Sequence, residues 1–195
     1  MTENLYSPSA LDPNVPINPQ TGAMFYIVSV KKFSVLYLAT MGFYQLYWFY
    51  KNWSLFRSAT KEDIWPAPRA IFSIFFVHSL LRHVYEKIVG AGKTIEVNPQ
   101  SYATLLVVLL VISNGLERAA QKSIGSPYTD IASIAMVFPI FFQLRKAQIA
   151  INLACDDTDG ASNKEFTTVN KMWITLGLIW WGLALLAILT ESLPA

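Results

Sequence analysis

The side chains best placed to do chemistry in this sequence are four ionisable residues in the segment 70–88. His78, Arg82 and Glu86 stand four residues apart, so an α-helix places them along one face, with His83 beside them. Inside a membrane bundle, such a stripe is typical of a proton or anion site in which the histidine titrates. The alternative is that Arg82, His83 and Glu86 form the hydrated end of a short transmembrane helix, and we favour this interpretation.

The two histidines do not form a helical metal pair. His78 and His83 are five residues apart, whereas metal ligands on one helix are three or four residues apart and share a face. The acidic stretch 156–160 invites comparison with a calcium loop. With Gly160 at the sixth position, however, Cys155 and Phe166 occupy positions that need carboxylates. The sequence therefore predicts no metal site.

Motifs of other catalytic sites are also absent from the sequence. It contains no G-x-S-x-G nucleophile elbow, no phosphate loop and no dinucleotide-binding G-x-G-x-x-G. The one cysteine, Cys155, excludes an intrachain disulfide and is expected as a buried or interfacial thiol. We therefore expect no catalytic residues, no cofactor and no enzymatic activity.

The composition indicates that most of the chain is not surrounded by water. Of the 195 residues, 53% are apolar and only 14% are charged, against about 25% charged in soluble proteins. These values exclude a disordered chain and argue against a soluble globular protein. The net charge of +2 is too small to predict a nucleic-acid partner.

Apolar segments along the chain predict an all-α, polytopic membrane protein with four or five transmembrane helices. The first and the last contain no charged residue and are close to the roughly 20 residues that a bilayer requires. The apolar parts of the others are shorter, and their charged ends extend them, because long basic side chains can reach the interface. Pro139 should kink the fourth helix. The expected segments are 33–50, 70–88, 102–118, 131–148 and 172–190.

The beginning of the chain differs from the rest. Residues 1–23 are predicted to be a disordered, proline-rich tail, because they contain four prolines and lack the basic start and apolar core of a signal peptide. Residues 24–195 are expected to form a single helical membrane domain. The apolar run 24–30 fits either an interfacial strand or the first turns of the first helix.

Aromatic residues gather around the first loop and predict contact with lipid headgroups. Trp and Tyr prefer the membrane interface. The stretch 52–61 is typical of a short helix that lies on the surface, with basic side chains able to meet phosphates. Simple anchoring is the favoured role for this region and lipid binding the alternative. The candidate lipid or interface contacts are Trp48, Trp53, Arg57, Lys61 and Trp65.

One stretch resembles a known family pattern. Segment 32–53 contains T-x-G-x-Y-x-x-Y-W-x-Y from Thr40 to Tyr50 after a basic residue, and it resembles the DUF4234-like group of bacterial membrane proteins. Segment 143–152, Asn170 and the final apolar run are similar to the C-terminal half of such proteins. The resemblance implies a helical protein of the bacterial inner membrane. It implies no activity, substrate or cofactor.

Two functions remain open at this point. The expected one is a non-enzymatic accessory or structural component of the bacterial inner membrane that binds membrane lipids, another membrane protein or a second copy of itself, and no nucleic acid. The alternative is a small transporter or channel subunit that uses the His78–Arg82–Glu86 stripe. That alternative predicts that the stripe faces an interior cavity shared with Ser113, Asn114 or Gln143.

Overall fold

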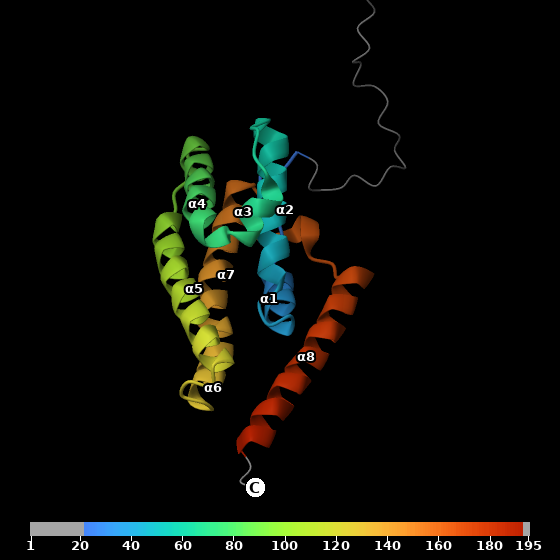
Figure 1. Cartoon of the computed structure of the whole chain (residues 1–195). Coiled ribbons are helices and arrows are strands. Elements are labelled where there is room, and N and C mark those ends of the chain that lie inside the picture. The colour runs from blue at the N-terminus through green and yellow to red at the C-terminus, as the bar shows by residue number, and fades with distance from the viewer. Residues whose placement is uncertain (1–21, 193–195) are drawn as a thin grey trace, which may run out of the picture.

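The computed structural model describes residues 22–192, and all regular secondary structure in this part of the chain is helical. Its α-helices are joined by short connections and one 3-10 turn (Figure 1). This confirms the predicted all-α class. Most of the expected N-terminal tail, residues 1–21, lies outside the described residues. The elements are α1 (Val30–Ala39), α2 (Tyr44–Thr60), α3 (Pro66–Ile71), α4 (Ser73–Gly90), α5 (Pro99–Gln121), α6 (Tyr128–Ala135), α7 (Val137–Ala154), η1 (Ala161–Asn163) and α8 (Thr168–Ser192).

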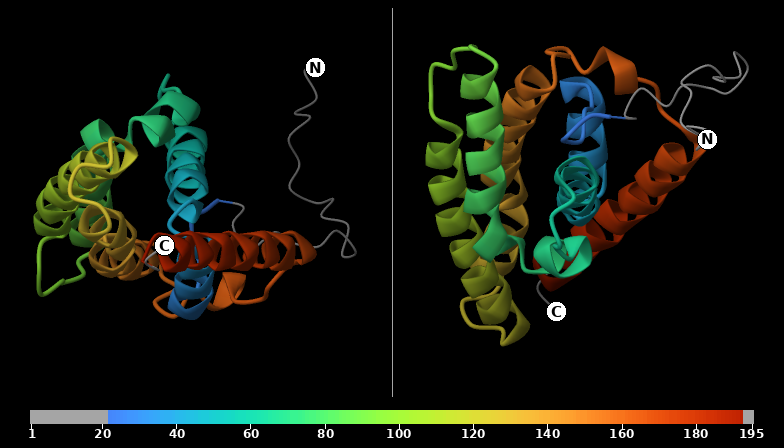
Figure 2. Two further views of the ribbon diagram at one scale, coloured as in Figure 1. Left: turned by 60° about the horizontal axis from the view of Figure 1, so that its bottom comes forward. Right: turned by 90° about the horizontal axis from the view of Figure 1, so that it is seen from above.

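Three helical stretches in the described part of the chain are long and apolar enough to cross a membrane. They are Pro99–Gln121, Tyr128–Ala154 and Thr168–Thr190. In both views α5 and α8 run in the same general direction, while α7 runs back (Figures 1 and 2). Helices of this length and apolarity are typical of membrane proteins.

The first apolar segment, 33–50, is not the single transmembrane helix that we predicted. The chain turns between α1 and α2, where Met41 and Gly42 have φ values of 50° and 86°. Thr40 supports the turn, because its Oγ1 accepts a hydrogen bond of 3.1 Å from the backbone N–H of Tyr44. As a result α1 and α2 point in clearly different directions (Figure 2).

The second predicted segment, 70–88, is also divided. α3 ends at Ile71, and α4 begins at Ser73 after a break at Phe72. α4 carries both Arg82 and Glu86, and it is not among the three helical stretches that are long and apolar enough to span. The last three predicted segments therefore account for the candidate spans in the described residues.

Pro139 interrupts the fourth predicted helix as expected. α6 ends at Ala135, α7 begins at Val137, and Met136 lies between them. Proline has no N–H to donate to the carbonyl of the residue four positions earlier, which here is Ala135. The helical ladder is therefore broken one turn before the proline.

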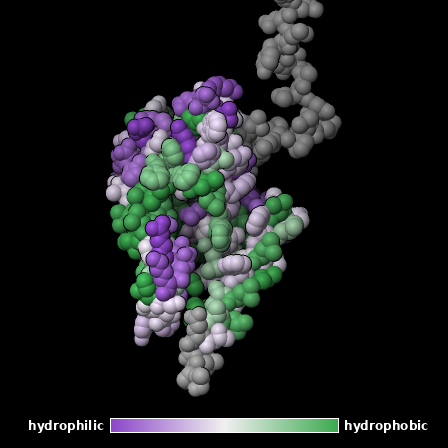
Figure 3. All heavy atoms as spheres, in the orientation of Figure 1, coloured by the Kyte–Doolittle hydropathy of each residue, from purple (hydrophilic) through white to green (hydrophobic). Residues whose placement is uncertain are grey.

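The core lies where α1, α2, α4 and α7 meet. Its fully buried side chains include Trp48, Trp53, Tyr37, Phe33 and Leu80. Phe33 packs against Phe141 of α7, with ring centroids 6.4 Å apart. Hydrophilic residues gather at the end of the molecule where α2 and α4 finish, and hydrophobic residues cover much of the middle and of α8 (Figure 3). A second hydrophilic patch lies in the lower half (Figure 3).

Candidate functional site

An extended segment before α1 is buried inside the protein. Residues Phe25, Tyr26, Ile27 and Val28 are at most 5% exposed and lie in neither a helix nor a strand. The run 24–30 is therefore neither of the two alternatives left open by the sequence, and only its last residue, Val30, belongs to α1. Buried backbone N–H and carbonyl groups need hydrogen-bond partners. In this segment the partners are side-chain amides.

Asn52 of α2 and Gln148 of α7 bind the backbone of Tyr26. The Tyr26 N–H donates to Asn52 Oδ1 at 3.0 Å, and Gln148 Nε2 donates to the Tyr26 carbonyl at 3.1 Å. The indole N–H of Trp48 donates to Gln148 Oε1. Both amides and the indole are buried, so these bonds form away from water and leaving one unmade is costly.

Asn152 of α7 and Asn163 of η1 bind the next two residues. Asn152 bonds to both the N–H and the carbonyl of Val28, at 3.4 and 3.0 Å. Asn163 Nδ2 donates to the Ile27 carbonyl at 2.8 Å. We call Asn52, Gln148, Asn152 and Asn163 the amide clamp.

Gly160 allows the loop after α7 to approach the extended segment. Its φ is +65°, and a Cβ at this position would lie 2.5 Å from the backbone of Val28 and Ser29. Any side chain here would collide with backbone atoms that cannot move aside. The loop therefore reaches Asn163 into the clamp only because residue 160 is glycine.

Lys32, at the start of α1, is a buried cation with neutral partners. The residue is 3% exposed, and its Nζ donates to Asn163 Oδ1 at 2.7 Å and to the backbone carbonyl of Glu165 at 2.6 Å. Burial lowers the pKa of Lys32, and the nearby Glu165 carboxylate opposes this shift. Within the described residues, no carboxylate lies within ion-pair distance of its ammonium group.

A cleft opens beside Lys32, between α1, α2 and the start of α8. Its volume is about 1000 Å³, at the upper end of the range for small-molecule sites. The cationic side chains in its lining are Lys32 and Lys51, and in the part of the chain that the structure describes neither aspartate nor glutamate contributes to it. The apolar residues in the lining include Leu36, Phe43, Leu46, Leu55 and Trp173.

Three tyrosines supply neutral hydroxyl groups to this cleft. Tyr26, Tyr44 and Tyr47 all line it, and the Tyr44 hydroxyl donates to that of Tyr26 at 3.3 Å. Burial, together with the neighbouring Tyr26, raises the pKa of Tyr47 to about 12. The Tyr47 hydroxyl therefore stays protonated at physiological pH and can donate a hydrogen bond.

The side of the cleft opposite α2 is closed by α8, which docks on the end of α1. A Cβ at Gly177 would collide with the backbone carbonyl of Ala39, so the two helices touch backbone to backbone. The indole N–H of Trp181 donates to the Leu38 carbonyl at 2.8 Å. The remaining surface of α8 is open, and none of its apolar window is buried.

The predicted polar stripe lies on the outside of α4. Arg82 Nε is 3.8 Å from Glu86 Oε1, and the two side chains are 56% and 59% exposed. His83 Nδ1 lies 3.2 Å from Glu86 Oε2, and its ring stacks on Phe56 with centroids 4.5 Å apart. The structure therefore brings together Arg82, His83 and Glu86, but on an exposed surface.

His78 faces a different neighbour. Its Nε2 lies 3.2 Å from Thr104 Oγ1 of α5, and two residues before Thr104 the ring of Tyr102 is covered by Lys146 Nζ at 5.5 Å. Lysine and tyrosine at one level are typical of a membrane interface. Because α4 and α5 are antiparallel, Arg82 lies one turn further out, which fits the hydrated end of a helix better than an interior site.

The predicted interface residues divide into two groups. Trp48 and Trp53 do not contact lipid, because both are fully buried. The guanidinium of Arg69 covers the Trp53 ring at 4.4 Å. This corrects the expectation for Trp48 and Trp53, which line the protein core, whereas Tyr47, Tyr50 and Trp65 are exposed. Arg57 and Lys61 are exposed, and Trp65 is 72% exposed.

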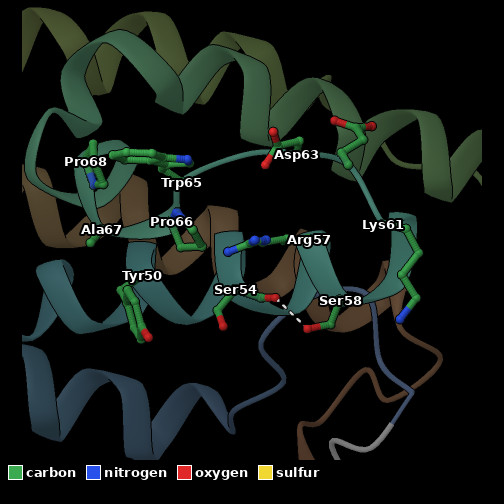
Figure 4. Close-up of a pocket in the computed structure, with 11 residues that line it drawn as sticks. Tyr50, Ser54, Arg57, Ser58, Lys61, Asp63, Trp65, Pro66, Ala67 and Pro68 are labelled. Carbon is green, nitrogen blue, oxygen red and sulfur yellow. Dashed lines mark hydrogen bonds between the residues drawn. The ribbon is translucent and has the colours of Figure 1, made fainter.

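These exposed residues line a second hollow of about 760 Å³ between α2 and α3. Arg57 points into it toward Pro66, whereas Lys61 points away (Figure 4). Glu62 and Asp63 also line the hollow, so its charges offset one another. Among the described residues, no group of three or more His, Cys, Asp or Glu side chains is arranged to hold a metal ion.

The sequence analysis missed Lys32, the amide clamp and the cleft. Lys32 follows Lys31 and precedes an apolar run, which is the pattern of an ordinary charge flanking a membrane helix. A usable signal was the pair Gln148 and Asn152, which are four residues apart and therefore share one face of a largely apolar helix.

Comparison of the chain with protein-family models, curated proteins and solved structures found no match. The resemblance to the DUF4234-like group therefore stays a prediction, and the function has to be argued from the site.

Proposed function

We propose that this protein is a non-enzymatic membrane component that binds lipid, with α5, α7 and α8 crossing the bilayer. The observation that carries the proposal is the surface of α8. Leucine, isoleucine and tryptophan side chains on every face except the one that docks on α1 are more than half exposed, among them Leu176, Ile179, Trp180 and Leu183. In water each would forgo roughly 1.5–3 kcal/mol of burial free energy, whereas lipid tails cover them without cost.

The cleft supports binding of individual lipids in addition to simple immersion. Its walls are mainly apolar, and one end carries the buried Lys32 and neighbouring hydroxyl groups. A site with apolar walls and a small number of placed polar groups is typical of ligand pockets. Because α8 forms one wall, the cleft adjoins the surface that the proposal places in the bilayer.

The proposal includes a topology with three crossings in place of the four or five expected. The loops 91–98 and 155–167 would lie on one side of the membrane, and the loop 122–127 and the end of α8 on the other, as their positions suggest (Figure 1). α1 would enter between α7 and α8, because its end contacts Gly177 and Trp181 in the middle of α8, and α3 and α4 would lie toward the first side. Residence in the bacterial inner membrane is part of the proposal on the residue pattern of 32–53 alone.

The experiment that tests lipid binding is purification in mild detergent followed by lipid extraction and mass spectrometry. We expect phospholipid to be retained at about one molecule per protein through washes that remove bulk lipid. Leu46→Trp, which fills the cleft, should reduce retention, and Val35→Trp on α1, outside the cleft lining, should not. Lipid-free protein, or co-purification of a protein in place of lipid, would contradict the proposal.

A further inference from the structure

The strongest unexplained feature of the molecule is the charge of Lys32. An ammonium group has three donors, and two of them are used by Asn163 Oδ1 and the Glu165 carbonyl. Both acceptors are neutral oxygens, and burial of an unpaired charge is unfavourable. The Glu165 carboxylate acts on this charge only from beyond ion-pair distance. An anion in the cleft would accept the third donor and place an opposite charge in direct contact.

The charge of the whole cleft favours the same kind of ligand. Lys32 and Lys51 contribute two cations to its lining, and among residues 22–192 no acidic side chain lines it. The hollow between α2 and α3 provides the contrast, because Glu62 and Asp63 lie there beside its basic residues. Of the cleft and the hollow, only the α1–α2–α8 cleft has a net positive lining, and this charge favours an anionic ligand.

The depth of Lys32 fits a lipid phosphate. Its partners Asn163 and Glu165 lie just before α8, whose first turn is capped by Thr167 and Asn170 through two reciprocal hydrogen bonds of 3.1 and 3.2 Å. A helix that begins at a polar cap and continues into an apolar span begins near the membrane interface, where headgroups lie. Lys32 is thus close to headgroup level.

The remaining lining suits an acyl chain. Phe43 and Leu46 are 63% and 43% exposed although both face the cleft. Trp173 of α8 lines the cleft as well. A lipid tail lying along α2 would cover these apolar surfaces. The cleft therefore combines an apolar part that fits an acyl chain with a cationic part, at Lys32, that fits a phosphate.

Resting on the proposed function, we propose that the cleft selects an anionic phospholipid, whose phosphate binds the Lys32 ammonium while an acyl chain lies along the apolar side chains of α2. Lys51 adds a second positive charge, and the tyrosine hydroxyls and Asn163 offer neutral hydrogen bonds to phosphate or glycerol oxygens.

The experiment uses the full chain in vesicles that contain equal amounts of phosphatidylglycerol and phosphatidylcholine with the same acyl chains. The protein is extracted in mild detergent, and the retained lipids are counted by mass spectrometry. We expect the wild type to retain phosphatidylglycerol about tenfold over phosphatidylcholine, because both phosphates can bind Lys32 but the choline cation would be repelled by Lys32 and Lys51, whereas the glycerol headgroup is neutral.

The variants separate charge from structure. Lys32→Gln keeps hydrogen-bond donors and should abolish the preference, while Lys32→Arg should keep most of it. Lys31→Gln is the matched control, because Lys31 is the exposed neighbour on the same helix and should be neutral. If Lys32→Gln fails to fold, Lys51→Gln provides the test. This variant should reduce the preference for phosphatidylglycerol without removing a buried group.

Equal retention of both lipids by the wild type, or an unchanged preference in Lys32→Gln or Lys51→Gln, would overturn this inference and leave lipid binding standing. Retention of neither lipid would overturn the proposed function as well. Retention of free fatty acid in place of phospholipid would also overturn the inference.

Discussion

Asn152 of α7 binds both backbone polar groups of Val28, a residue 124 positions earlier in the chain, with bonds of 3.4 and 3.0 Å. Paired strands exchange hydrogen bonds in the same way. Here a side-chain amide replaces the neighbouring strand. The start of the chain is thereby fixed to a helix that belongs to a candidate membrane span.

Asn152→Ala should destabilise the protein strongly, because it leaves the N–H and the carbonyl of Val28 buried without this partner. Two such groups cost about 2–6 kcal/mol together. Denaturant unfolding in detergent micelles measures this free energy. Asn114→Ala is the control, since Asn114 is exposed and donates only to the Leu110 carbonyl of its own helix. Equal effects of the two substitutions would contradict a structural role for the clamp.

The spans of α5 and α8 could be predicted from the sequence. The run in α8 is uninterrupted and close to the bilayer thickness, the run in α5 is shorter and extended by its charged end, and the predicted segments 102–118 and 172–190 fall within Pro99–Gln121 and Thr168–Ser192. In such runs composition alone determines the structure, because a helix is the way to satisfy backbone groups in lipid.

The turn at residues 40–43 and the clamp could not be predicted in the same way. Gly42 stands in an apolar run, where glycine is also common within transmembrane helices. The choice of a turn depends on α2 packing its buried Trp48 and Trp53 against the core. The partner of Asn152 is set by tertiary structure, because Val28 is far from it in sequence.

Gly177→Leu should release α8 from α1, whereas Gly182→Leu should not. A side chain at residue 177 would collide with the Ala39 carbonyl, while a Cβ at residue 182 meets no atom within 4 Å. We expect a lower Tm in detergent for the first variant and an unchanged Tm for the second, measured by circular dichroism. Trp181→Phe should show an intermediate effect of about 1 kcal/mol from its lost hydrogen bond. Matching Tm values for both leucine variants would rule out this docking contact.

His83→Ala should cost more stability than Arg82→Ala. The imidazole of His83 stacks on Phe56 at 4.5 Å, and aromatic contacts of this kind contribute about 0.5–1.5 kcal/mol. Arg82 forms an exposed pair with Glu86, and such pairs contribute about 0–1 kcal/mol. Thermal unfolding of the two variants in the same detergent makes the comparison. A larger loss for Arg82→Ala would indicate that the pair is sheltered in the membrane.

Cys155 should react slowly with maleimide until the pH is well above the usual range for a thiol. Burial raises the pKa of Cys155, which outweighs the opposite effects of the Phe25 carbonyl contact and nearby lysines. The thiolate is the reactive form. The pKa of Cys155 is higher in the folded protein than in the unfolded chain. The neutral thiol therefore contributes to the free energy of unfolding below the unfolded-state pKa, and this contribution is lost as the pH rises through the folded-state pKa. The measurement is the rate of maleimide reaction at Cys155 as a function of pH, in the folded protein and in denaturant. Identical pH–rate profiles would show that the thiol is not buried.

The central claim is that α5, α7 and α8 lie in lipid, and cysteine accessibility in sealed vesicles tests it most directly. On a Cys155→Ser background, single cysteines replace Gly125, Lys164 and Leu183. A membrane-impermeant maleimide should label the first two from opposite sides of the membrane and should not label the third from either side. Labelling of residues 125 and 164 from the same side, or rapid labelling of residue 183, would contradict the account.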